Sequence, residues 1–291
     1  MLREYAFHTV DVFTRVRFGG NPLAVFPDAR GLDAATMQSL AAEMNYSETT
    51  FVFPPENSAN TARVRIFNRT AELPFAGHPN VGTANVLSRL GVATGSVLRF
   101  EELAGLVEVR LLSEGHCEID APQPLQCLGE LPVEAIAACL SVDPKRIVTH
   151  AHAPMRASVG LEFVLVEVEA GALALAAPDI GAYRRCANSA RGLGGRLSIF
   201  LYAREGFNIR ARMFAPLAGT WEDPATGSAN AALAALLLSL GEEERLTVQT
   251  VQGREMGRRS DLTMRAWRTR DGIRASVGGG CIPVFSGTVS L

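Results

Sequence analysis

The sequence is poor in cysteine, and its cysteines follow no recognisable pattern. The five of them are scattered, are odd in number and include no Cys-x-x-Cys pair: Cys117, Cys127, Cys139, Cys186 and Cys281. Disulfide frameworks and thiol-based redox or zinc sites need cysteines at characteristic spacings. The pattern therefore indicates a reduced compartment and predicts a cytoplasmic protein.

Long apolar runs and long runs of one charge are also missing. The longest apolar candidate, residues 229–240, is shorter than the roughly 18 residues of a membrane-spanning helix. Arg3 and Glu4 stand where a signal peptide would carry its apolar segment. The chain has 28 basic and 30 acidic residues and a net charge of −2, so we expect neither a membrane nor a nucleic acid as a partner.

Motifs that bind common cofactors are absent as well. The sequence contains no Walker loop and no Gly-x-Ser-x-Gly nucleophile turn. His150 and His152 could place two imidazoles on one side of a strand, but no third ligand is evident, so we interpret them as part of a surface loop. We expect no metal and no cofactor.

What the sequence does contain is a long repeat. Arg65-Ile66-Phe67 matches Arg212-Met213-Phe214 at a shift of 147 residues. Gly82-Thr83-Ala84-Asn85 matches Gly227-Ser228-Ala229-Asn230 at a shift of 145. Each copy reads as a strand, a loop and a helix. A long-period repeat that occurs twice in 291 residues indicates two similar domains.

The helix of the second copy is apolar on all sides. Residues 224–241, PATGSANAALAALLLSLG, carry no charge, and a helix without a polar face is buried. The neighbouring segments read as strands, so we predict a curved sheet around a central helix in each half. The segment APQPLQCLGELP, residues 121–132, has three prolines and is the best candidate for the linker between the halves.

The starts of the two repeated helices suit the binding of an anion. Small residues surround both starts, and the first backbone N–H groups of a helix have no partner within it. Such an end can receive a carboxylate or a phosphate. The alternative is an ordinary capped helix with a turn before it. Near these starts, His78, Asp223 and Ser228 have side chains that can transfer or relay protons.

Glu48 is a second acidic candidate. It opens an otherwise apolar strand in the segment NYSETTFVF, where partial burial would raise the pKa of its carboxyl group. The alternative is that Glu48 only ends the strand in solvent.

Several segments in order along nearly the whole chain resemble the PhzF-like proteins of phenazine biosynthesis, which have the diaminopimelate epimerase-like fold. The matching segments are FGGNPLAVF (18–26), NYSETTFVF (45–53), LPFAGHPNVGTANVL (73–87), EDPATGSAN (222–230), QGREMGR (252–258) and GGGCIPVFSGTV (278–289). The resemblance implies an α+β fold of two pseudo-symmetric halves, each a barrel-like mixed β-sheet around a central α-helix. We expect residues 1–121, joined by a strand at 281–291, to form one half and residues 122–280 the other. The resemblance places the active site in the cleft between them.

The same resemblance implies an activity and a set of site residues. A characterised member of the family isomerises a dihydro-hydroxyanthranilate, moving a proton across an allylic system without a cofactor. By motif, Glu48 is the acid/base and Asp223, His78 and Ser228 complete the catalytic set. The backbones of Gly77, His78, Gly227 and Ser228 would hold the substrate carboxylate, and the substrate-binding residues are Gly77, Gly227, Thr226 and Asn80. Family members commonly form homodimers, so we expect one here.

Two other functions stay open. The chain could bind a small molecule in the same cleft without catalysing its reaction. It could also be a racemase or epimerase that uses Glu48 with another partner. Racemases of the wider fold use one cysteine from each half, at positions that fall near Ala76 and Thr226, and no cysteine lies in either loop.

Overall fold

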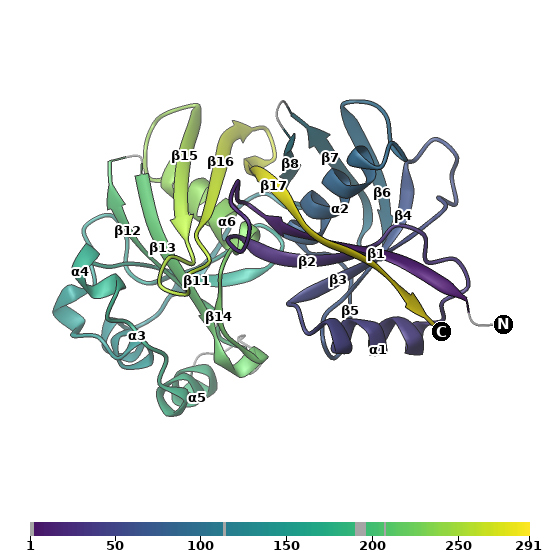
Figure 1. The fold of residues 1–291 in the computed structure, drawn as a ribbon. Helices are drawn as coiled ribbons and strands as arrows, with labels where there is room; N and C mark the ends of the chain where they lie inside the picture. Colours follow the sequence, from purple (N-terminus) through teal and green to yellow (C-terminus); the bar gives the residue numbers. More distant parts are fainter. Residues whose placement is uncertain (1–2, 113–114, 190–195, 207) are drawn as a thin grey trace. The chain divides into compact units, whose positions relative to one another are not determined.

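A computed structural model describes residues 3–112, 115–189, 196–206 and 208–291. The chain forms two compact units (Figure 1). The N-terminal unit comprises Met1–Asp120 together with Gly278–Leu291, and the C-terminal unit comprises Ala121–Val277. Within the described residues, no helix is long and apolar enough to cross a membrane.

The N-terminal unit is a closed sheet around one helix. Its elements are β1 (Glu4–Val12), β2 (Asn21–Phe26), α1 (Ala34–Met44), β3 (Glu48–Phe53), β4 (Ala62–Phe67), β5 (Glu72–Leu73), α2 (Gly77–Arg89), β6 (Val97–Glu102), β7 (Gly105–Leu111), β8 (His116–Asp120) and the last part of β17 (Gly272–Ser290). The strands pair in the order β17-β1-β2-β3-β4-β6-β7-β8, and β8 pairs with β17 to close the ring. In this series, β2 and β3 pair in parallel, and so do β4 and β6.

Helix α2 fills the interior of this ring. It contacts β1, β2, β3, β7 and β8, and ten of its 13 residues are buried. Gly82 makes the close approach possible, because a Cβ atom at that position would lie 2.6 Å from Cδ2 of Leu23 and 2.8 Å from Cγ2 of Val12. The small residues that the sequence places in this helix thus bring it against two strands at once.

The C-terminal unit repeats this arrangement. Its elements are β9 (Gln126–Glu130), α3 (Val133–Leu140), a 3₁₀ turn (Pro144–Arg146), β10 (Met155–Ser158), β11 (Glu162–Glu167), α4 (Ala170–Leu173), α5 (Ile180–Ser189), β12 (Ile199–Glu205), β13 (Asn208–Ala215), a second 3₁₀ turn (Pro216–Ala218), β14 (Thr220–Asp223), α6 (Gly227–Ser239), β15 (Arg245–Gln252), β16 (Ser260–Thr269) and the first residues of β17. The strands pair in the order β9-β10-β11-β12-β13-β15-β16, with β11–β12 and β13–β15 parallel. Helix α6 contacts β10, β11, β15 and β16, and ten of its 13 residues are buried.

The two units therefore share one topology, and the predicted fold class is confirmed. In each unit, four strands pair in the order antiparallel, parallel, antiparallel: β1-β2-β3-β4 in the first and β10-β11-β12-β13 in the second. A short strand and the central helix follow, β5 and α2 or β14 and α6. The next strand pairs in parallel with the fourth and begins a hairpin, β6-β7 or β15-β16. The protein is an α+β fold of two pseudo-symmetric halves, each a barrel-like sheet around a central helix. The uncharged segment at residues 224–241 is the central helix of its half, as the sequence predicts.

The register of the repeat differs from the one that the sequence suggests. Helices α2 and α6 begin at Gly77 and Gly227, so their equivalent residues are 150 positions apart and not 145. His78 is therefore the counterpart of Ser228. The strands β4 and β13 keep the shift of 147, because Arg65 and Arg212 occupy the same place in both units. Arg65 pairs with Glu72, seven residues on, and Arg212 pairs with Glu222, ten residues on. Three extra residues in the second loop explain the change from 147 to 150.

The predicted linker is wrong over part of its length. Residues Gln126–Glu130 form strand β9, which pairs antiparallel with β10. Proline has no N–H group to donate within a sheet, but it is tolerated at the ends of a strand. A proline-rich segment can therefore contain a short strand between its prolines. The division between the units falls at its start, between Asp120 and Ala121.

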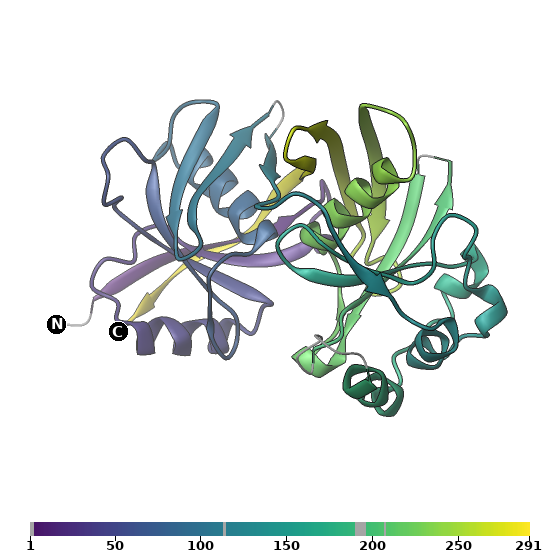
Figure 2. The same ribbon diagram turned by 180° about the vertical axis from the view of Figure 1, so that it is seen from behind.

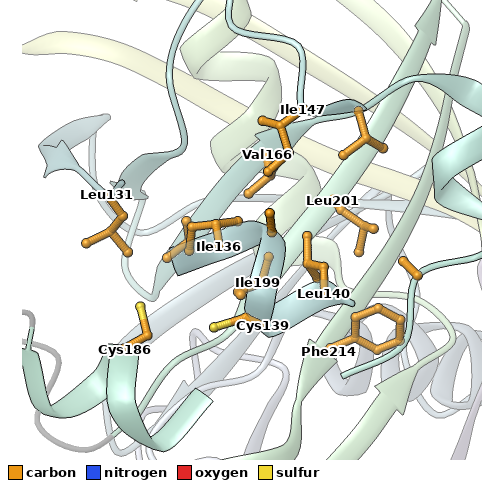
Figure 3. Packing of buried hydrophobic residues seen from close by; sticks show 14 of the residues in the cluster. Leu131, Ile136, Cys139, Leu140, Ile147, Val166, Cys186, Ile199, Leu201 and Phe214 are labelled. Atoms are coloured by element: carbon orange, nitrogen blue, oxygen red, sulfur yellow. The ribbon is translucent and has the colours of Figure 1, made fainter. Parts of the chain in front are cut away.

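Each sheet also packs against helices on its outer face. In the N-terminal unit α1, capped by the carboxylate of Asp33, covers a cluster that includes the stacked rings of Phe26 and Phe51. In the C-terminal unit α3, α4 and α5 cover β11 and β12, as seen from behind in Figure 2. Figure 3 shows this second cluster, in which Ile136 and Leu140 of α3 meet Val166 and Leu201 of the sheet. Both central helices are thus held in sheets that are themselves buttressed.

Candidate active site

Glu48 lies at the first position of β3, where the strand leaves solvent for the interior. It is opposite Leu23 of β2 in the parallel register, and its side chain is 18% exposed. The four residues that follow, Thr49–Val52, are buried. The sheet therefore holds the carboxylate at the edge of an apolar region rather than in bulk solvent.

His78 lies in the first turn of α2, next to Glu48. Its Nε2 atom is 3.4 Å from Oε2 of Glu48, and its side chain is only 7% exposed. Burial lowers the pKa of His78 from 6.5 to about 3, so the imidazole is neutral near pH 7 and the contact is not an ion pair. Within the described residues, Nε2 makes no hydrogen bond of normal geometry. A neutral imidazole beside a carboxylate can pass a proton in either direction.

We expect the imidazole of His78 to stay neutral across the neutral pH range. Because its folded-state pKa is about 3 and its ordinary value is 6.5, the stability that the neutral ring contributes is complete above about pH 6.5 and is lost as the pH falls towards 3. A histidine NMR titration tests this, with the signal assigned from a His78→Asn variant. A midpoint near 6.5 would show that burial does not control this ring.

The starts of both central helices lack the usual side-chain cap. Ala76 and Thr226 occupy the N-cap positions, and neither side chain accepts a hydrogen bond from its helix, whereas Asp33 accepts one from Thr36 at the start of α1. A Cβ atom added to Gly77 would meet no atom within 4 Å, so the space beside this backbone is open. Uncapped first-turn amides with open space beside them can bind an anion.

Two buried asparagines brace these helix starts. The Nδ2 atom of Asn80 donates to the carbonyl of Ala76, and that of Asn230 donates to the carbonyl of Thr226, both at 3.0 Å. Both asparagine side chains are fully buried. They hold the turn in place from within, and the substrate contact predicted for Asn80 stays a prediction.

Asp223 and Thr226 are brought together at the start of α6. The Thr226 hydroxyl donates to Oδ2 of Asp223 at 2.6 Å, and Nε2 of Gln252 donates to the same hydroxyl at 3.0 Å and to the carbonyl of Asp223 at 2.8 Å. This chain of donors fixes the orientation of the Asp223 carboxylate. Ser228 is the second residue of α6, in the same turn of the chain, and its side chain is half-buried.

Gln252 is a site residue that the sequence does not reveal by motif alone. It is fully buried, and its Oε1 atom accepts hydrogen bonds from the backbone N–H of Thr226 and from Nδ2 of Asn230. With the two bonds from Nε2, all of its hydrogen-bonding capacity is used. Its signal in the sequence is weak but real: it continues the buried alternation Val248, Thr250, Gln252, where an apolar residue is the norm.

The interpretation of residues 150–152 as a surface loop is wrong for His152. Its side chain is 7% exposed, with Nε2 2.6 Å from the Tyr202 hydroxyl and Nδ1 2.6 Å from the carbonyl of Ala153. His150 is exposed. Tyr202, which is fully buried in β12, gives His152 a partner that the sequence pattern does not indicate.

A family model matches almost the whole chain. Residues 10–287 match the family described as phenazine biosynthesis-like protein. An uncharacterized isomerase of Mesorhizobium japonicum is 36% identical over 99% of both chains. The trans-2,3-dihydro-3-hydroxyanthranilate isomerase of Pseudomonas chlororaphis is 35% identical over 97% of this chain and 98% of its own.

Solved structures show the same fold. A PhzF-family protein of Bacillus anthracis superposes with a TM-score of 0.88 over 99% of both chains, at 20% identity. A hydroxyproline epimerase of Agrobacterium vitis superposes with a TM-score of 0.63 over 99% of this chain and 93% of its own, at 13% identity. At these identities the likeness concerns the fold alone.

Proposed function

The chain belongs to the phenazine biosynthesis-like family and is an isomerase, and we propose that it moves a proton within a small unsaturated carboxylate by general acid–base catalysis. The observation that carries this proposal is the pair formed by Glu48 and His78 at the uncapped start of α2. It combines a proton acceptor, a neutral relay and an anion-binding helix end within one unit.

In the proposed reaction, Glu48 takes a proton from one carbon of the substrate and returns it to another. The double bond shifts between them, so no electrons are gained or lost and no cofactor is needed. His78, which burial keeps neutral, relays the proton that Glu48 carries or forms a hydrogen bond with the Glu48 carboxyl group. Asp223 and Ser228 stabilise the enol-type intermediate.

In this proposal, the backbone N–H groups at Gly77 and those at Gly227 each form a helix start that can receive a carboxylate of the substrate. The positive end of each helix dipole favours a negative charge there. Thr226 supports the second of these turns through its bond to Asp223. Positioned acid–base catalysis gives about 10²–10⁴-fold acceleration, so binding of the carboxylate must supply much of the rest.

Deuterium exchange tests the proposal. The enzyme is incubated in D₂O with trans-2,3-dihydro-3-hydroxyanthranilate and with a panel of cyclic and open-chain unsaturated acids, and the acids are analysed by mass spectrometry and NMR. We expect at least one bound acid to take up deuterium at carbon with a shifted double bond. Glu48→Gln serves as the inactive control.

Two other results would replace the isomerase proposal. Binding without any exchange would identify a small-molecule-binding protein. Exchange with inversion at a stereocentre and no shift of the double bond would identify an epimerase that uses no cysteine pair. The expected cytoplasmic location and homodimer are independent of this experiment and stay predictions.

A further inference from the structure

Glu102, the last residue of β6, occupies the place in the N-terminal unit that Gln252 occupies in the C-terminal unit. In the parallel pairs, Arg63 of β4 lies opposite Glu101, and Arg210 of β13 lies opposite Val251. Arg63 and Arg210 are equivalent at the shift of 147 that β4 and β13 share. The next residue along each partner strand is Glu102 in one unit and Gln252 in the other.

The surroundings of the two residues share one feature, the buried asparagine in the first turn of the central helix. Gln252 holds the start of α6 through Thr226, Asp223 and Asn230. The counterpart of Asn230 is Asn80, which braces the start of α2 with the same bond to the carbonyl four residues earlier. Asn80 also acts on Glu102 through a side-chain interaction. Glu102 is thus placed to hold the start of α2.

The polar atoms at this place lack a donor. Both carboxylate oxygens of Glu102 are buried without a hydrogen bond of normal geometry, and so is Oδ1 of Asn80. Three buried acceptors without a donor disfavour the ionised form of Glu102, because each loses its hydrogen bonds to water without replacement. One proton on Glu102 supplies the missing donor.

We propose that Glu102 is a positioning residue that acts as a neutral carboxylic acid: its O–H donates to Oδ1 of Asn80 and holds the first turn of α2, and with it His78. Gln252 holds the start of α6 through different bonds, since its Nε2 atom donates to the Thr226 hydroxyl and the Asp223 carbonyl and its Oε1 atom accepts from Asn230. The importance of that turn for turnover rests on the proposed isomerase function, whereas the protonation of Glu102 does not.

The environment of Glu102 favours the protonated form. Burial raises the pKa of its carboxyl group from 4.5 to about 8, against the opposing effect of the Asn80 amide. A groove of about 760 Å³ beside it is lined by Arg63 and Arg65 of β4, Glu72 of β5, and Glu56 and Glu101. Each guanidinium group forms an ion pair, Arg63 with Glu56 through Nη1 and Arg65 with Glu72, and Nε of Arg63 makes no hydrogen bond of normal geometry within the part of the chain that the structure describes. From α2, His78 is neutral, so no free cation near Glu102 among these groups stabilises the carboxylate.

The stability of the protein should therefore carry a pH dependence that glutamine removes. Because the folded-state pKa is raised, the contribution of Glu102 is complete below about pH 4.5 and is lost as the pH rises to about 8. Over this window the unfolding constant of the wild type should rise relative to that of Glu102→Gln by up to about tenfold per pH unit. Chemical denaturation at several pH values measures this. Glu101→Gln, a change at the neighbouring carboxylate, should leave the dependence unchanged.

The positioning role is tested at His78 and by turnover. Glu102→Gln keeps a hydrogen-bond donor at this position. It should leave the His78 NMR signals at their wild-type positions and keep turnover near pH 7 within about twofold of the wild-type value. Glu102→Met provides no donor and should shift the His78 signals and lower kcat more than tenfold.

Two results would overturn the proposal. Equal pH dependence of stability in the wild type and Glu102→Gln would show that Glu102 is not protonated in the fold. Undisturbed His78 signals in Glu102→Met would show that it does not position the turn. Both readouts need no turnover and can be repeated in a Glu48→Gln background, so they remain valid if the isomerase proposal fails.

Discussion

Replacing Glu48 with glutamine is expected to lower turnover by about 10²–10⁴-fold while leaving the fold intact. Glutamine keeps the size and shape of the side chain at the first position of β3, but it can neither accept nor release a proton at neutral pH. His78 cannot take over as an equal base, because burial holds its pKa near 3. The loss should therefore appear in kcat and not only in KM.

Turnover and deuterium uptake are measured for the variant under the same conditions as for the wild type. Glu108→Gln is the matched control, since Glu108 is an exposed glutamate in the same unit that pairs with Arg99 at 2.8 Å. That change should leave turnover unaffected. A Glu48→Gln enzyme with wild-type turnover would remove Glu48 from the proposed role of acid/base.

Replacing Arg212 with methionine is expected to cost about 3–5 kcal/mol of the free energy of unfolding. Arg212 forms a two-point ion pair with Glu222, and each side chain is only 9% exposed. Its Nη1 atom also donates to the carbonyls of Leu173 and Ala176. Methionine fills the space but leaves a buried carboxylate and two carbonyls without their donor.

The pseudo-symmetry of the fold supplies the control. Arg65 makes the same two-point pair with Glu72 and lies over the ring of Phe67 as Arg212 lies over Phe214. Its side chain and that of Glu72 are 27% and 23% exposed, so water can solvate the glutamate that Arg65→Met leaves behind. We expect that variant to lose about 1 kcal/mol or less.

Urea denaturation followed by circular dichroism measures both losses. Tryptophan fluorescence adds a probe of the C-terminal unit, where both tryptophans, Trp221 and Trp267, lie. Equal losses in the two variants would mean that burial does not set the strength of these pairs.

Much of the architecture follows from local patterns. The helix Val133–Leu140 and the Asp33 cap of α1 are features of this kind, because periodicity and capping depend on neighbouring residues. The uncharged run at 224–241 predicts a buried central helix for the same reason. The prediction of a linker at residues 121–132 was wrong in part. Prolines indicate where regular structure is interrupted, but they do not show that the residues between them pair with another strand.

The candidate site was less accessible from the sequence. The motifs indicate Glu48, His78, Asp223 and Ser228 as candidates, but their spacing does not show that His78 lies against Glu48 or that its ring is neutral. Both facts depend on the strands and the helix that enclose the ring. Gln252 and Glu102 lie at the ends of strands, and only the pairing of β13 with β15 and β4 with β6 makes them equivalent.

The sequence by itself determined the duplicated plan, the buried helix of the second half and the membership of a family, because these depend on the order and polarity of residues along the chain. Only the tertiary structure decided that the helices are equivalent at a shift of 150, that His78 corresponds to Ser228, and that Glu102 corresponds to Gln252. Loops of unequal length hide such equivalences from a comparison of letters. The hydrogen bonds between strands show which residues of the two units correspond, because each paired residue has one fixed partner across the sheet.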